Sequence, residues 1–103
     1  MNFSEGDVLY VRIDYKTGSE QETEQDGMDS MEYLQRLAGE RFVAAGVFGN
    51  METEEIDGAM ILFSAKSLEE AIRISNEDPV IQRGFYRCEV RPWNLMLLSK
   101  QDS

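Results

Sequence analysis

The residues best suited to chemistry gather in one stretch towards the C-terminal end, NEDPVIQRGFYRCEVRPW, residues 76–93. Asp78 precedes Pro79 here, and an aspartate in a cleft can act as an acid or a base when its surroundings raise its pKa. A nearby arginine would instead keep it ionised. The structural alternative is that a residue before proline leaves the helical region, so that the pair ends a helix. Both interpretations stay open at this point.

Three arginines follow that aspartate and fall within a span of nine residues: Arg83, Arg87 and Arg91. A guanidinium can hold a carboxylate or phenolate oxygen through two parallel N–H groups. Arg87 and Arg91 occupy alternate positions, so we expect them on one face of a final strand. That strand should lie beside the first, where Arg12 and Asp14 share a face, which predicts a charged patch on the sheet face that no helix covers. The patch is either an ion-pair network that includes Glu89 or a site for an anionic or aromatic ligand. The ligand-binding candidates are Tyr10, Arg12, Arg83, Arg87, Arg91 and Trp93.

No histidine occurs among the 103 residues, which removes the side chain most often used for proton transfer near neutral pH. A carboxylate, Tyr, Lys or Cys must then supply any acid–base chemistry. The single cysteine, Cys88, cannot form an internal disulfide, and its alternation with Tyr86 and Val90 predicts a small core residue. Because the common zinc-binding patterns need histidine or several cysteines, we expect neither a metal nor a cofactor.

Charge and length limit the class of protein. Twenty acidic residues against ten basic ones give a net charge of −10, which repels nucleic acid and anionic membrane surfaces. No apolar run approaches the roughly 18 residues of a membrane span, and the first residues, MNFSEGDVLYV, show no secretory signal. We therefore expect one cytoplasmic domain over residues 1–103, with no nucleic-acid or membrane partner. An acidic loop would cover about residues 16–30, and a tail about residues 94–103.

Hydrophobic periodicity predicts the order strand, helix, strand, strand, helix, strand. The strands are residues 7–15, 41–49, 58–65 and 84–93. The first helix is capped by Asp29 or Ser30 and runs to about Glu40, and the second is capped by Ser67 and runs to about Asn76. This order is the ferredoxin-like βαββαβ arrangement of an α+β protein, a four-stranded antiparallel sheet with the first and third strands central.

Right-handed crossovers place both helices on one face of that sheet. The second and third strands carry apolar side chains on both faces, so the uncovered face is too apolar for water and needs another cover. The simplest cover is a second copy, sheet against sheet. This predicts a dimeric α+β barrel, with a homodimer or a higher even oligomer as the assembly.

Several short motifs in a fixed order resemble the YCII-related (YciI-like) proteins. The motifs lie in MEYLQRLAGERFVAAGVFGN and GAMILFSAKSLEEAIRISNEDPVIQRGFYRCEVRPW: a glycine-led third strand, an S-LEEA helix, the D-P pair and a strand ending in RPW. The resemblance covers about residues 28–93 and implies a small homodimeric or higher-order α+β barrel with an active site in a cleft. It also implies a catalytic pair, a histidine at the start of the first helix and the aspartate of the D-P motif.

The resemblance carries that aspartate to Asp78, whereas the histidine position matches Ser30, or Asp29 if the register slips by one. Serine is not a base near neutral pH, and a second carboxylate would repel Asp78. Tyr33, on the same helix, remains a candidate proton donor, with packing as its structural alternative. We therefore expect a YciI-like small-molecule-binding protein that lacks the catalytic pair. One alternative is a cofactor-independent lyase, isomerase or dehydrohalogenase that uses Asp78 on an anionic or aromatic substrate. Another is a cofactor-free monooxygenase-like barrel.

Overall fold

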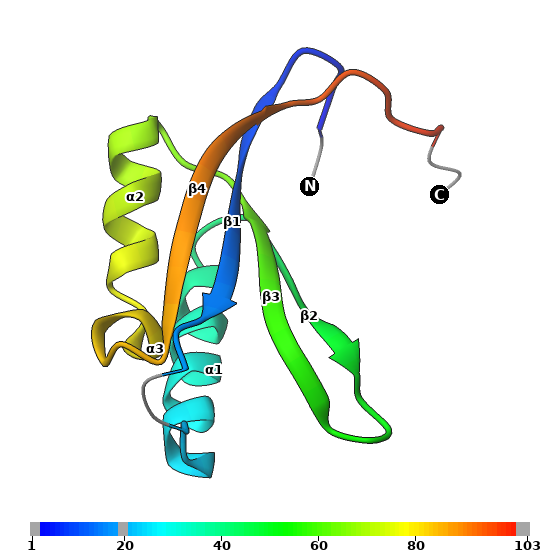
Figure 1. Ribbon diagram of the computed structural model, residues 1–103. Coiled ribbons are helices and arrows are strands. Elements are labelled where there is room, and N and C mark those ends of the chain that lie inside the picture. The colour runs from blue at the N-terminus through cyan, green and yellow to red at the C-terminus, as the bar shows by residue number, and fades with distance from the viewer. Residues whose placement is uncertain (1–2, 19–20, 101–103) are drawn as a thin grey trace.

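The computed structural model describes residues 3–18 and 21–100, which form four strands and three helices. In chain order these are β1 (Val8–Lys16), α1 (Glu24–Ala38), β2 (Val43–Asn50), β3 (Glu55–Phe63), α2 (Leu68–Asn76), α3 (Pro79–Gln82) and β4 (Tyr86–Asn94). The strands make one antiparallel sheet in the order β2-β3-β1-β4, and the helices lie on one of its faces (Figure 1). This architecture confirms the ferredoxin-like α+β prediction. Among the helices described, none has the length and apolar character needed to cross a membrane.

Helix α1 begins at Glu24, inside the segment predicted to be an acidic loop, so that prediction is wrong from this residue onwards. Thr23 is the N-cap and forms a capping box with Asp26, in which each side chain accepts a hydrogen bond from the other residue's backbone N–H. Apolar periodicity does not detect these first turns because they contain almost no apolar residue. Residues 19 and 20 of the predicted loop and residues 101–103 of the predicted tail lie outside the described residues.

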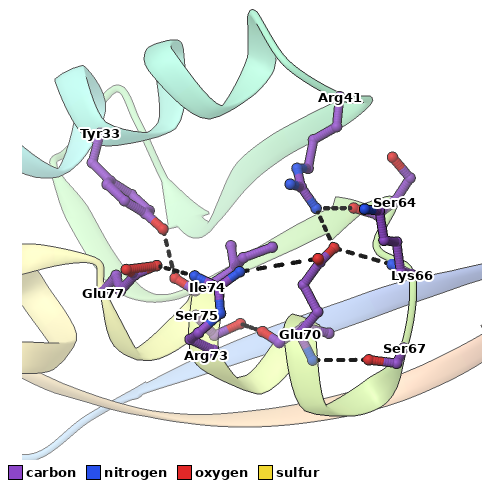
Figure 2. Close-up of polar contacts among 11 residues, drawn as sticks. Tyr33, Arg41, Ser64, Lys66, Ser67, Glu70, Arg73, Ile74, Ser75 and Glu77 are labelled. Carbon is purple, nitrogen blue, oxygen red and sulfur yellow. Dashed lines mark hydrogen bonds and ion pairs between the residues drawn. The ribbon is translucent and has the colours of Figure 1, made fainter.

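Helix α2 begins at the predicted N-cap, where the Ser67 hydroxyl accepts a hydrogen bond from the backbone N–H of Glu70 at 3.1 Å. The Glu70 carboxylate in turn accepts hydrogen bonds from the Lys66 N–H at 3.0 Å and from the Arg41 guanidinium at 2.8 Å (Figure 2). These contacts tie the start of α2 to the segment that leads into β2.

The buried face of α2 consists of Ala71, Ile74 and Ser75. Leu68 and Ile72, two large apolar residues of this helix, are exposed. Ser75 is fully buried on this face. Its hydroxyl donates to the carbonyl of Ala71 at 2.8 Å, so no polar group is left without a partner.

The hairpin between β2 and β3 is longer than predicted, because β3 starts at Glu55 and includes the polar residues before Gly58. The register of the pair shifts between Phe48 and Gly49, at a β-bulge. Gly49 has a φ of 122°, and a Cβ at this position would collide with the backbone of Glu55. Glycine at this position therefore permits the bulge and the extra strand pairs.

The hydrophobic core lies between the sheet and the helices. Tyr10 of β1 pairs with Phe63 of β3, and Arg12 of β1 pairs with Ile61, so these side chains all point to the helices. The core cluster of buried residues is Tyr10, Leu37, Ile61, Phe63, Ala71 and Ile74. Two charged side chains of β1, those of Arg12 and Asp14, are thus enclosed beside the core.

The prediction that Arg12 shares a charged patch with Arg87 and Arg91 on the open sheet face is wrong. Arg87 and Arg91 of β4 pair with Tyr15 and Val11, which point away from the helices, so they lie on the opposite side of the sheet from Arg12. The alternating pattern of β1 does not show which of its two faces the helices cover. The charge of Arg12 favours the prediction that its face is exposed. Burial is possible because carboxylates in the interior compensate that charge.

Candidate functional site

A buried ion cluster of Arg12, Asp14 and Asp78 links β1 to the start of α3. The Arg12 guanidinium donates through Nε and Nη2 to the two carboxylate oxygens of Asp14, at 2.7 and 2.6 Å. Its Nη1 donates to Oδ2 of Asp78 at 2.9 Å. All three side chains are at most 3% exposed. Because water is excluded and the Arg12–Asp14 pair is bidentate, the cluster holds the guanidinium in one orientation.

Local sequence explains how each member reaches the cluster. Arg12 and Asp14 are two residues apart on a strand, so their side chains share a face. Asp78 is the N-cap of α3, where its Oδ1 accepts the N–H of Val80 at 3.1 Å and Pro79 takes the first helical position. The prediction that Asp78–Pro79 ends the preceding helix is confirmed, and Arg12 is the arginine beside this carboxylate.

Two carboxylates share one guanidinium, so the cluster carries a formal charge of −1, from one positive and two negative side chains. Burial alone would lower the pKa of Arg12, but the hydrogen bonds and charges of Asp14 and Asp78 outweigh burial and raise that pKa. Burial also raises the pKa of Cys88, with Arg12 opposing and the two aspartates reinforcing the rise. A thiol with a raised pKa is a poor nucleophile, which agrees with a packing role for Cys88.

A cavity of about 340 Å³ lies beside this cluster, between α1 and the helix-facing side of β1, β2 and β3. We call it the α1 cavity. Its walls are mainly apolar and include Leu34, Val47, Ile56 and Ala59. The polar lining residues are Arg12, Asp14, Glu22, Ser30 and Tyr86. A concave apolar space with a few polar groups at one end is the usual form of a small-molecule site.

Ser30 of α1 lines the cavity and is 9% exposed. No hydrogen bond within residues 3–18 and 21–100 involves its hydroxyl, which contrasts with Ser75, the buried serine of α2. A hydroxyl that lines a cavity without a protein partner can bind a molecule inside it. Ser30 is also the residue that matches the histidine position in the family resemblance.

Glu22 and Tyr86 close the polar end of the cavity. The Tyr86 hydroxyl donates to Oε1 of Glu22 at 2.8 Å. Burial, then the hydrogen bond to Glu22, and then the charges of Glu22 and Asp14 all raise the pKa of Tyr86. Tyr86 therefore stays protonated at neutral pH and donates to the Glu22 carboxylate at the cavity wall.

Tyr33, the predicted proton donor, lies outside the cavity lining. Its hydroxyl donates to the backbone carbonyl of Ile74 at 2.7 Å, so it fastens α1 to α2 (Figure 2). Burial raises the pKa of Tyr33, and the charges of Glu77 and Asp78 raise it further. The contact is the one expected from the packing alternative.

Arg83 also lies away from the cluster. Its Nη1 bonds Asp26 and Asp29, each at 2.8 Å, so it joins the end of α3 to the first turns of α1. The backbone and hydroxyl of Thr23, followed by Arg83, lower the pKa of Asp26. For Asp29 the hydrogen bond from Arg83 is the largest cause of a lowered pKa. Part of the predicted acidic loop thus has a structural role.

The remaining ligand-binding candidates do not meet at one place. Arg87 lies over the ring of Tyr15 at 4.5 Å, a cation–π contact. Arg91 and Trp93 are exposed on β4, whereas Tyr10 is in the core. Within the described residues, no ion pair joins Arg87 or Arg91 to an aspartate or a glutamate. Of the six candidates, Arg12 alone lines the cavity.

Sequence reasoning missed Glu22 and Tyr86 as cavity residues and Asp14 as the bidentate partner of Arg12. The two-residue spacing of Arg12 and Asp14 is a signal that could have paired them. The contact between Glu22 and Tyr86 spans 64 residues, and no local pattern reports such a pair.

Comparison with known proteins supports the fold and the family. A solved structure of 5-chloro-2-hydroxyhydroquinone dehydrochlorinase from Burkholderia phenoliruptrix AC1100, in complex with 2,5-dihydroxybenzoquinone, is similar, with a TM-score of 0.65 and 16% sequence identity. The similarity covers 84% of this chain and 93% of that one. No curated protein sequence gives a significant match. The family model of the YCII-related domain matches residues 8–94, and the chain therefore belongs to the YCII-related family.

Proposed function

We propose that this chain is a small-molecule-binding member of the YCII-related family and that the α1 cavity is its binding site. The observation that carries the proposal is a cavity of about 340 Å³ with apolar walls and a fixed polar end built on Arg12 and Asp14. This volume is at the small end of the roughly 300–1,000 Å³ found for ligand pockets. A ligand of one aromatic ring or a similar apolar body suits it. The dehydrochlorinase of similar fold was solved with a small ring compound, which is compatible with such a ligand.

Binding is favoured over catalysis because the positions that the family resemblance assigns to the catalytic pair offer no free base to the cavity. Asp78 is 0% exposed, and its two oxygens already accept from Arg12 and from the Val80 N–H. In the family resemblance the histidine position matches Ser30, which is no base near neutral pH, or Asp29 if the register slips by one, whose carboxylate already bonds Arg83. In this proposal Asp78 acts as a positioning residue, because it orients Arg12 without touching the ligand.

A cofactor-free lyase or isomerase is the second candidate, and the reaction named for the dehydrochlorinase favours it. In that case Asp78 would have to leave Arg12 during turnover and reach the substrate. An assay of hydrogen chloride release from a chlorinated hydroquinone distinguishes the binding protein from the enzyme. It is run with wild type and with Asp78→Asn. The binding proposal predicts no release by either protein, and release by wild type that Asp78→Asn abolishes would establish the enzyme instead.

A cavity-filling substitution tests the binding proposal. Ala45 pairs with Ile61, so its side chain points to the helix side, and it lines the cavity; Ala44, its neighbour, points to the open face. We expect fragment-sized aromatic compounds detected by ligand-observed NMR to lose binding to Ala45→Leu and to keep it with Ala44→Leu. Sedimentation of both variants checks that the oligomeric state is the same. Equal binding by the two variants would contradict the proposal.

We also propose that the open sheet face is covered by a second copy of the chain. Three large apolar residues on this face are strongly exposed in the isolated chain: Phe48 at 46%, Met60 at 40% and Trp93 at 44%. Exposed apolar residues on one face favour association. Sedimentation should give a dimer or a higher even oligomer for wild type and a smaller species for Met60→Lys. Ile72→Lys, at an equally exposed site on α2, is the control. A wild-type monomer at micromolar concentration would contradict this proposal.

A further inference from the structure

The α1 cavity contains more negative than positive charge. Arg12 is the one cation among its lining residues, and both Asp14 and Asp78 already neutralise it. Glu22 adds a further negative charge at the cavity wall, and its hydrogen bond comes from the neutral hydroxyl of Tyr86. The nearby guanidinium of Arg83 is engaged with Asp26 and Asp29 and does not offset Glu22.

An anionic ligand would place a third negative charge around one buried guanidinium. Like charges in a site of low dielectric constant repel strongly, so such a ligand is disfavoured. A cation meets the opposite situation, because the excess charge of the cluster and of Glu22 attracts it. The net charge of the whole chain, −10, acts in the same direction.

Two acceptor groups at the polar end can receive N–H donors. Oε2 of Glu22 is free of hydrogen bonds within the described part of the chain, since Tyr86 uses Oε1. The Ser30 hydroxyl also lacks a protein partner there and lines the cavity, and Oε2 of Glu22 lies 4.0 Å from where a Cβ on Gly27 would be, about one helical turn before Ser30. An ammonium group offers three donors, so it can bond both residues and still place its apolar body against Leu34 and Ala59.

We infer that the α1 cavity selects a small organic cation, a protonated amine on an apolar or aromatic body, held by Glu22 and Ser30. The inference rests on the proposed function, because it names the class of ligand for the same cavity. It replaces the anionic class that the arginines of the sequence suggested. The apolar walls supply contact area for the body of the ligand, and the excess negative charge favours a cationic ligand over a neutral or anionic one.

Three matched probes test the inference: benzylamine, benzyl alcohol and benzoate, titrated into the full chain at neutral pH and low salt by isothermal calorimetry. They share a ring and differ in charge. We expect benzylamine to bind at least about tenfold tighter than benzyl alcohol, a factor equivalent to about 1.4 kcal/mol, and benzoate to bind most weakly. If benzyl alcohol binds as well as benzylamine, the charge inference falls while the cavity proposal stands. If none of the three binds, both fall.

Two matched variants test whether the preference for a cation arises at the cavity or from the overall negative charge of the chain. Glu22→Gln removes the acceptor charge at the cavity, whereas Glu24→Gln removes the same charge from an exposed residue that does not line it. We expect Glu22→Gln to lower the preference for benzylamine over benzyl alcohol by several-fold, and Glu24→Gln to leave it unchanged. Ser30→Ala should weaken benzylamine more than benzyl alcohol. Equal losses in Glu22→Gln and Glu24→Gln would overturn the inference, because they would trace the preference to overall charge.

Discussion

Replacing Asp78 with asparagine tests whether this carboxylate is a structural partner of Arg12 or a reactive group. The asparagine Oδ1 can still accept the N–H of Val80, so the cap of α3 survives. Its Nδ2 would face Nη1 of Arg12, where the carboxylate now accepts at 2.9 Å. Two donors then oppose each other in a place that water does not reach. The substitution therefore removes one buried, charge-assisted hydrogen bond without changing the shape of the side chain.

The magnitude follows from these contacts. A hydrogen bond to a charged group contributes about 1.5–3 kcal/mol. Arg12 keeps its bidentate contact to Asp14, so the loss stays below the roughly 3–5 kcal/mol of a fully broken buried pair. Removing one of two carboxylates also relieves their repulsion. We therefore expect Asp78→Asn to lower the free energy of unfolding by about 2 kcal/mol, which lowers the Tm of a chain of this size by about 10 °C.

Thermal and urea unfolding followed by circular dichroism measure this change. The control is Asp57→Asn, since Asp57 is exposed and makes no hydrogen bond or ion pair among the described residues. It should shift the free energy of unfolding by no more than about 0.5 kcal/mol. An Asp78→Asn protein with wild-type stability would refute the structural role, and the loss of a measurable turnover in the same protein would identify Asp78 as catalytic.

Three further predictions concern the scaffold of the cavity. Ser67→Ala removes the N-cap of α2 and should cost about 1 kcal/mol in urea unfolding, and no loss would contradict the cap. Gly49→Ala should cost more than about 1 kcal/mol, because the φ of 122° and the facing backbone exclude a side chain, and a neutral effect would mean that the bulge can relax. Hydrogen bonds from Thr23 and then Arg83 lower the native pKa of Asp26 below 3.8, and for Asp29 the hydrogen bond from Arg83 is the largest cause, so these contacts stabilise the fold above that pH and are lost as the pH falls through the native values. Arg83→Gln should therefore lower the Tm near neutral pH and less so in acid, and a constant difference across this range would refute the coupling.

The fold could be predicted because the pattern of β-strands and helix caps is local. Ser67, followed three residues later by Glu70, marks the start of α2, and the alternation of β4 places Tyr86 and Cys88 under the helices. The start of α1 could not be predicted from apolar periodicity, because a capping box between Thr23 and Asp26 and a distant arginine stabilise it instead. Polar residues thus form the first turns of a helix within the predicted loop.

The site was less predictable, because its members meet through the tertiary fold. The sequence directs attention to Asp78, but its partner, Arg12, lies 66 residues away and on the face of the sheet opposite to the one predicted. A strand with alternating apolar and charged residues has two possible orientations, and charge favours the exposed one. Burial of the charged face became possible because Asp14 and Asp78 reach the same guanidinium. The sequence pattern of one strand cannot predict that carboxylates will compensate the charge of Arg12.

Chemical-shift mapping with benzylamine tests the central claim, that the α1 cavity is the binding site, most directly. In a titration of the ¹⁵N-labelled chain, we predict the largest amide shifts at cavity residues from different elements, Ser30 of α1, Ala59 of β3 and Tyr86 of β4. Amides of β4 residues that do not line the cavity and whose side chains point away from the helices, such as Trp93, should change little. Shifts that cluster on the open sheet face, or no shifts at saturating benzylamine, would contradict the claim.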